Sequence, residues 1–278
     1  MKDPIDRNVV RLFRSGIHLW LIGFVATALP ASRSLWTDPI SPCLPQPGIF
    51  GPITTMFCGW AEGLEWIGIV VLLIGCIHQL VRPANAIVAI VIWAIYMSLM
   101  QRAWLAGSGG QQLIGNMLFW LIFLPGEKRG TPWNPGPIAI GAFWILRLQL
   151  LIAYVATVFH KFTGTHWIDG SALSIVVTDD AFGPAWIAEF PLVAAVGTWS
   201  ILLFQATFPI AVWWKRMRAI WMIAGVIFHL CTAIWLEIPD MALAFIVCYA
   251  IWLDGREATA ILDRIRMPLI GSARPARA

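Results

Sequence analysis

Eight long apolar runs, separated by short polar segments, dominate the pattern of this chain. Most of them reach the roughly 20 residues that an α-helix needs to cross the hydrocarbon core of a bilayer, and the fourth and eighth are shorter. Proline and glycine interrupt the chain between runs, as in VRPAN, LPGEKRGTPWNPGP and EIPDM. The pattern predicts an all-α fold, a polytopic membrane helix bundle of about eight transmembrane helices. The runs are 13–30, 62–81, 84–104, 111–125, 138–161, 191–214, 219–237 and 240–254.

Composition supports a membrane protein and argues against a water-soluble fold. The chain is 59% hydrophobic and 12% charged, whereas a soluble domain carries roughly 25% charged residues. The 17 tryptophans fit the same class, because indoles favour the membrane interface. The net charge of +4 comes from short basic clusters scattered between apolar runs. We therefore expect membrane lipid as a partner and no nucleic acid.

The distribution of lysine and arginine predicts the orientation. With eight spans and both termini cytoplasmic, all but four of the 19 Lys and Arg residues fall on the inside, and only Arg33 and Arg102 fall outside. The chain then divides into a cytoplasmic N-terminal segment 1–12, a single transmembrane bundle 13–254, and a basic, poorly periodic cytoplasmic tail 255–278. A second interpretation takes ATALPAS as a signal-peptide cleavage site, which leaves seven spans with unchanged sidedness.

Two extracytoplasmic segments, 31–61 and 162–190, are too long to be plain turns, whereas the inside connections are short. Long loops laid over a helix bundle commonly carry function. We expect a cavity that opens outward, on the extracytoplasmic face.

The five cysteines suggest packing rather than metal chemistry. Cys43 and Cys58 flank the first long loop on the oxidising side, where a disulfide and two free thiols are both compatible with the sequence. Cys76, Cys231 and Cys248 lie inside apolar runs and are expected to pack there. No CxxC spacing occurs, so no metal site is predicted.

The fifth run carries two basic residues at membrane depth. Arg147, Tyr154 and Lys161 are spaced by seven and so share one helix face. Arg147 lies about 20 Å from Lys161 along the helix, so each needs a separate partner. Lys161 either snorkels to the outer interface or is a desolvated amine that acts as a base. Its position at the end of the run favours the first interpretation, whereas the adjacent His160 and the following WIDG favour the second.

Other ionisable residues are candidate partners. His229 lies in the middle of the seventh run, where a hydrogen bond to a neighbouring helix is the structural explanation. Glu62 and Glu65 enter the second run from outside, three residues apart on one face, and either neutralise Lys161 or Arg147 or lie at the interface. No Ser-His-Asp, HExxH, P-loop or GxGxxG arrangement is present.

The segment AYVATVFHKFTGTHWIDGSAL resembles the characteristic motif of the vitamin K-dependent gamma-carboxylase-like transmembrane (HTTM) family. That motif is a tyrosine-bearing helix with a lysine at its outer end, followed by W-x-x-G and a small residue. GNMLFWLIFLP, AEFPLVAAVGTWSILLFQATFP and GVIFHLCTAIWLEIPDMALAFIVCYAIWL resemble further helices of the family. The resemblance covers about residues 10–255.

The resemblance implies an activity. In the carboxylases a lysine deprotonates reduced vitamin K, and dioxygen converts the quinol anion to a strong base. That base removes a proton from the gamma carbon of a glutamate, to which carbon dioxide adds. Carried over, Lys161 matches that lysine, His160 stands where a second lysine occurs in the animal enzymes, and His229 matches the helix histidine. These three are the catalytic candidates, and a reduced quinone of the vitamin K type is the expected cofactor.

The resemblance also implies a ligand site beside the catalytic candidates. Its residues are Tyr154, Arg147, Trp167, Asp169, Gly170, Glu62 and Glu65. The chain lacks the large lumenal part that binds the propeptide in the animal enzyme, and its interval between lysine and W-x-x-G is one residue longer. We therefore expect quinol-side chemistry in the maturation of a secreted peptide. The alternative is a non-catalytic scaffold or partner subunit for an exported peptide or an electron-transfer component; a transporter fits less well, because no paired broken-helix repeat is visible.

Overall fold

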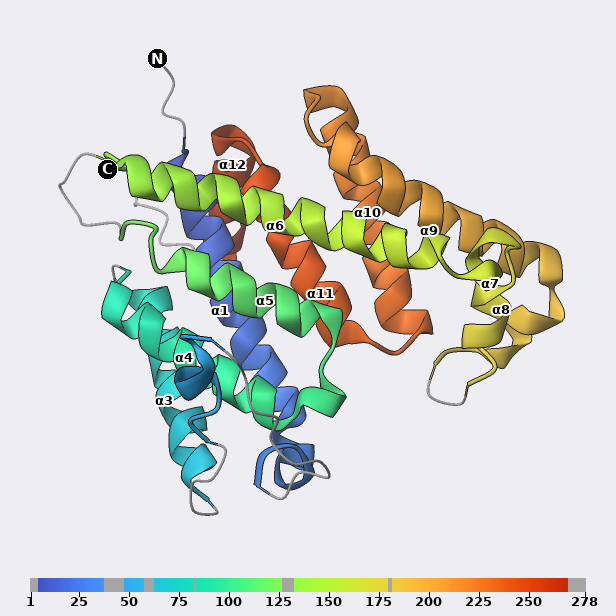
Figure 1. Ribbon diagram of the computed structural model, residues 1–278. Helices are drawn as coiled ribbons and strands as arrows, with labels where there is room; N and C mark the ends of the chain where they lie inside the picture. The colour runs from blue at the N-terminus through green and yellow to red at the C-terminus, as the bar shows by residue number, and fades with distance from the viewer. Residues whose placement is uncertain are drawn as a thin grey trace, which may run out of the picture.

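The computed structural model describes residues 5–37, 48–57, 63–82, 84–126, 133–179 and 182–269, and every regular element in these ranges is helical (Figure 1). Each of the eight apolar runs contains one helix. The eight are α1 (Arg7–Ala28), α3 (Leu64–Val81), α4 (Ala86–Arg102), α5 (Gly109–Leu121), α6 (Pro137–Phe162), α9 (Pro191–Ala211), α10 (Lys215–Trp235) and α11 (Pro239–Cys248). Shorter elements are η1 (Leu29–Ala31), η2 (Arg33–Thr37), α2 (Gly51–Thr54), η3 (Trp104–Ala106), α7 (Thr165–Ile168), α8 (Ala172–Val176), η4 (Ala185–Glu189) and η5 (Tyr249–Trp252), and α12 (Gly255–Leu269) follows the last apolar run.

Among the described residues, five helical segments are long and apolar enough to cross a membrane: Arg7–Ala31, Leu64–Val81, Pro137–Phe162, Pro191–Ala211 and Lys215–Trp235. The α4 helix and the combined α11–η5 segment are apolar but shorter. The longest helix, α6, has 26 residues, or about 39 Å at 1.5 Å per residue, which exceeds the roughly 30 Å of bilayer hydrocarbon. The structure therefore supports a helical membrane bundle.

Helix α1 lies inside the bundle, in contact with α3, α11 and α12 (Figure 1). Its residues Phe13, Ile17 and Leu21 are fully buried, and their spacing of four places them on one face. Helix α5 packs against α4, α6 and α11, and α6 packs along α9. Helix α10 is peripheral and buries only three residues, one of which is His229. The outer surfaces of α9 and α10 are therefore lined by exposed apolar side chains, as expected for contact with lipid.

Arginines at both ends of the bundle satisfy backbone carbonyl groups. Arg14 is buried and donates hydrogen bonds to the carbonyls of Leu124 and Pro125, beyond the end of α5. Arg102, at the end of α4, donates to the carbonyls of Trp36, Thr37 and Phe57. Its guanidinium thus joins two parts of the long segment 31–61, because five donors in a fixed fork can reach several acceptors at once.

The cysteine predictions have separate outcomes. Cys76 and Cys248 are buried in the hydrophobic core with free thiols, as expected from their place in apolar runs. Cys231 is also free and half-buried. Cys43 and Cys58 lie outside the described residues.

The expectation of a poorly periodic tail is wrong for 255–269, which forms the amphipathic helix α12. Ala258 is fully buried, and the Asn8 side-chain amide donates to the Thr259 hydroxyl at 2.8 Å, so α12 is docked on α1. The Asp254 carboxylate begins the helix by accepting the backbone N–H groups of Arg256 and Glu257. The sequence after the last apolar run is mostly polar, and the apolar face of α12 is narrow. This face is recognised from the contact between α12 and α1.

We predict that Gly110→Ala lowers the melting midpoint of the detergent-solubilised protein, whereas its neighbour Gly109→Ala does not. A Cβ atom on Gly110 would lie 2.6 Å from the Cα of Met241, which belongs to the backbone of α11, whereas a Cβ on Gly109 meets nothing within 4 Å. Overpacking of this kind costs about 1–3 kcal/mol. Alanine at an open helical position is favoured over glycine by about 0.5–1 kcal/mol. Equal midpoints for the two variants would show that α5 and α11 do not cross at Gly110.

A second prediction concerns the pH dependence of the α12 contact. The N–H of Glu257 and then the Lys215 ammonium, 3.1 Å away, hold the pKa of Asp254 below its usual value. Because the folded-state pKa is lowered, the stabilisation is present above the unfolded pKa of about 3.9 and is lost as the pH falls through the lower folded pKa. Asp254→Asn should lower the melting midpoint at neutral pH. The expected loss in the free energy of unfolding is about 1 kcal/mol or less, because the ion pair is partly exposed.

The control is Asp263→Asn, an exposed carboxylate on the same helix. Melting midpoints from neutral pH down to about pH 3 should show a gap between wild type and Asp254→Asn that closes in acid. Asp263→Asn should track the wild type at every pH. A gap for Asp254→Asn that stays constant in acid would contradict the assignment to its charge.

Candidate functional site

The side chain of Lys161 turns from the last turn of α6 toward α9. Its ammonium donates a hydrogen bond to Gln205 Oε1 at 2.8 Å and lies 4.2 Å from the centre of the Trp167 ring. The side chain is half-buried. No described carboxylate forms an ion pair with it. An amide oxygen and an aromatic face stabilise an ammonium less than a carboxylate does, so the charged form of Lys161 has weak support.

Tyr154 lies two helical turns from Lys161 on the same face of α6 and is fully buried. Its hydroxyl is 2.8 Å from His229 Nε2 on α10 and 2.5 Å from the Tyr249 hydroxyl on η5. The three groups form a chain of two hydrogen bonds between three elements. The prediction that His229 bonds to a neighbouring helix is confirmed.

His229 is 2% exposed and packs among aromatic rings. The Phe245 ring stacks on the imidazole at 4.8 Å, and the Phe228 ring meets it edge-on. Within the described part of the chain, its Nδ1 has no hydrogen-bond partner, although a buried polar atom normally has one. Nδ1 is therefore an unsatisfied polar atom in a closed aromatic setting.

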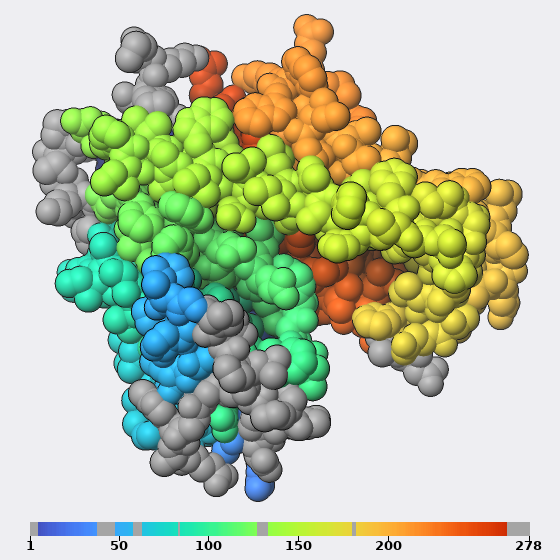
Figure 2. Space-filling view, viewed as in Figure 1, coloured from blue at the N-terminus to red at the C-terminus, as the bar shows by residue number. Residues whose placement is uncertain are grey.

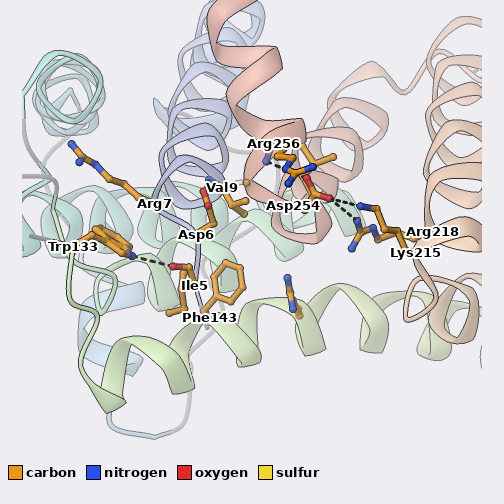
Figure 3. A pocket seen from close by; sticks show the side chains of 13 residues that line it. Ile5, Asp6, Arg7, Val9, Trp133, Phe143, Lys215, Arg218, Asp254 and Arg256 are labelled. Carbon is orange, nitrogen blue, oxygen red and sulfur yellow. Dashed lines mark hydrogen bonds and ion pairs between the residues drawn. The ribbon is translucent and has the colours of Figure 1, made fainter. Parts of the chain in front are cut away.

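Arg147 lies ten residues after the start of α6, about 15 Å along the helix. Its partner is separate from that of Lys161, as predicted. Its Nε donates to the Ile251 carbonyl at 3.0 Å, and its guanidinium lies about 5 Å from the Phe143, Trp144 and Trp252 rings. It lines a cavity of about 760 Å³ between the starts of α1, α6, α10 and α12 (Figure 3). Arg147 therefore does not share a site with Lys161.

Two further predicted residues lie away from Lys161 and His229. The imidazole of His160 is exposed and packs beside Phe159, with ring centres 6.0 Å apart. Glu65 is buried at the start of α3 and accepts the backbone N–H of Gly63, so it neutralises neither basic residue of α6. Glu62 lies outside the described residues.

The W-x-x-G motif has a structural basis. Trp167 contacts the Lys161 ammonium, whereas Asp169 is exposed and accepts the hydroxyl and backbone N–H of Ser171, which lower the pKa of Asp169. Gly170 has φ +85° and is buried against Ala195 and Trp199 of α9. A side chain there would be strained and would clash, so Gly170 brings the motif close to α9.

Sequence reasoning missed two members of the site. The sequence marks Gln205 only as one of several polar residues inside an apolar run, a candidate for a hydrogen bond between helices, and it does not single out Tyr249. The weak sequence signal for Tyr249 is Gly225 of α10. A Cβ atom at Gly225 would lie 2.3 Å from the Tyr249 hydroxyl, so only glycine leaves room for that side chain. A lone glycine inside an apolar helix indicates a close approach, but it does not name the neighbour.

The space-filling view shows a recess between α5 and the α7–α8 segment, with α11 visible at its base (Figure 2). It lies on the side where α6 ends and α9 begins. The described 760 Å³ cavity, in contrast, lies at the Arg147 end. The 760 Å³ cavity is therefore not the outward opening that the sequence predicts beside Lys161.

Comparison with protein-family models, curated proteins and solved structures finds no match to this chain. The likeness to the carboxylase-like family thus rests on the quoted segments alone. Within the described residues, no group of three or more His, Cys, Asp or Glu side chains could hold a metal ion.

We predict that Tyr154→Phe destabilises the protein more than Tyr249→Phe. The Tyr154 hydroxyl contacts both His229 and Tyr249, so its loss leaves two buried groups unpaired, at about 1–3 kcal/mol each. Tyr249→Phe leaves the Tyr154–His229 hydrogen bond intact. The double variant should cost less than the sum of the single variants, because they share one hydrogen bond. Melting midpoints of the four proteins measure this, and strict additivity would contradict the chain of hydrogen bonds.

Proposed function

We propose that this chain is an eight-span membrane protein of the carboxylase-like type. In this proposal Lys161 serves as a base toward a reduced quinone or a related apolar ligand. The chemistry would take place at the extracytoplasmic face of a bacterial inner membrane, in the maturation of a secreted peptide. The observation that carries the proposal is the Lys161 amine, which is hydrogen-bonded to the neutral Gln205 and has no carboxylate partner among the described residues.

The direction of the helices supports the proposed topology. The α6 helix runs from the Arg147 cavity to Lys161, and α9 returns beside it. The basic residues Lys215, Arg218 and Arg256 gather at the cavity end. The positive-inside rule assigns that end to the cytoplasm, and Lys161 then faces outward.

The residues present fit a quinone-type ligand. Phe204, Phe228 and Phe245 surround Tyr154 and His229 and provide an apolar setting for an aromatic ring. The orphan Nδ1 of His229 offers a hydrogen bond to a hydroxyl or carbonyl oxygen. A reduced quinone, when bound, supplies an acidic hydroxyl group and a ring that can be oxidised.

The residues of the chain have distinct roles in this proposal. Lys161 Nζ accepts the hydroxyl proton, and Gln205 Oε1 holds the amine in place before and after that transfer. Tyr154 fixes the His229 ring through Nε2, which leaves Nδ1 for the ligand. Trp167 covers the amine from the loop side and limits access of water.

We predict that Lys161→Arg and Lys161→Ala both abolish quinol-dependent oxygen uptake in nanodiscs that contain a reduced naphthoquinone. A guanidinium stays protonated at neutral pH and cannot act as the base. Loss of a general base typically lowers a rate by 10²–10⁴-fold. Oxygen uptake should therefore fall at least about 10²-fold, while the melting midpoint of Lys161→Arg stays near that of the wild type.

The matched control is His160→Ala, which alters the exposed neighbour and should leave uptake unchanged. Mass spectrometry of lipid extracts measures the bound quinone separately from turnover. Full activity of Lys161→Arg would show that Lys161 is not the base and serves only as an interfacial anchor. No bound quinone and no uptake in the wild type, together with co-purification of a partner protein, would favour the scaffold.

A further inference from the structure

Five basic side chains and two acidic ones line the 760 Å³ cavity at the far end of α6 (Figure 3). The acidic residues are Asp6 and Asp254. Glu257 pairs with Arg218 from outside the lining. Positive charge remains in excess even when all three carboxylates are counted. The basic residues are Arg7, Arg147, Lys215, Arg218 and Arg256.

The Arg147 guanidinium reaches the cavity from inside the bundle. It lies ten residues after the start of α6, or about 15 Å along the helix, so it is not a terminal loop anchor. Its Nε is bound to the Ile251 carbonyl, and the ring contacts with Phe143 and Trp252 hold its plane. Its two terminal nitrogens have no hydrogen-bond partner in the described part of the chain. A planar guanidinium with two free donors suits a tetrahedral anion.

The start of α10 adds a second, independent contribution. Lys215 and Arg218 come from its first turn, and no side chain caps that turn. The starts of α1 and α12, in contrast, are capped by Asp6 and Asp254. The free N–H groups of α10 and its positive dipole end therefore favour an anion beside these two cations.

Figure 3 shows how the charges are arranged around the cavity. Lys215 and Arg218 approach the Asp254 carboxylate from one side, at 3.1 and 3.8 Å. Arg256 comes from the first turn of α12, and its exposed guanidinium has no partner among the described residues. Two carboxylates, Asp6 and Asp254, thus lie among several cations that approach from different helices.

We propose that this cavity binds a phosphate-bearing anion. Donors that converge from α6, α10 and α12 match an anion with several oxygens in different directions better than a single carboxylate. The volume exceeds that of a bare phosphate and lies in the range of ligand pockets, about 300–1,000 Å³. Two sources share this chemistry: the headgroup of an anionic phospholipid, since the cavity lies where the helices leave the bundle, and a soluble phosphate compound.

The test compares Arg147→Gln, Arg256→Gln and the control Arg264→Gln with the wild type. Arg264 is an exposed arginine on the same helix as Arg256 but outside the cavity lining. Melting midpoints are measured in detergent with increasing pyrophosphate. They are also measured in phosphatidylcholine nanodiscs with and without phosphatidylglycerol. Arg256→Gln keeps the test decisive if Arg147→Gln does not fold.

We expect the ligand to raise the melting midpoint of the wild type. Each cavity variant should bind the ligand with an apparent affinity at least about tenfold weaker, because it loses a charge-assisted hydrogen bond. Arg264→Gln should retain it. A shift with phosphatidylglycerol alone identifies a lipid headgroup, and a shift with pyrophosphate identifies a soluble phosphate. No shift with either, or an equal loss in Arg264→Gln, would overturn the proposal.

Discussion

The polar face of α6 is the constraint on which the rest of the bundle depends. Three polar side chains at heptad spacing cannot be left unpaired in an apolar interior, so each must meet a group from another element. Arg147 binds the η5 backbone, Tyr154 binds α10 and η5, and Lys161 binds α9. Helices α9 and α10 bury few residues of their own. These hydrogen bonds therefore add specific contacts with α6 to the apolar packing of side chains such as Leu202 and Phe208.

Much of this arrangement follows from periodicity. Apolar runs locate the eight helices, because only a helix satisfies its backbone within an apolar segment. The spacing of Arg147, Tyr154 and Lys161 places them on one face, and their separation along the helix requires different partners, as the structure shows. A buried His229 bonded to another helix also follows from the cost of an unpaired imidazole.

The rest of the site depends on how each helix is rotated about its axis and on which elements it contacts. The spacing of residues in the sequence determines neither. His160 precedes Lys161 by one residue, and a single step turns a side chain about 100° around the helix, which places His160 on the exposed side. Glu65 has the right charge to pair with Lys161, but its helix packs on α1 and α4. Gln205 and Tyr249 became recognisable as partners only once α9 and η5 were placed beside α6.

The two ends of α6 differ in a way that bears on the role of Lys161. Basic side chains gather around the cavity near the start of α6, whereas Lys161 lies in the last turn of that helix. Under the positive-inside rule, a lysine at the opposite end from the basic cluster contributes nothing to orienting the bundle. A snorkelling lysine would also extend toward water, whereas Lys161 bends toward Gln205 and lies against Trp167. Its geometry is therefore not that of a lysine extended toward water.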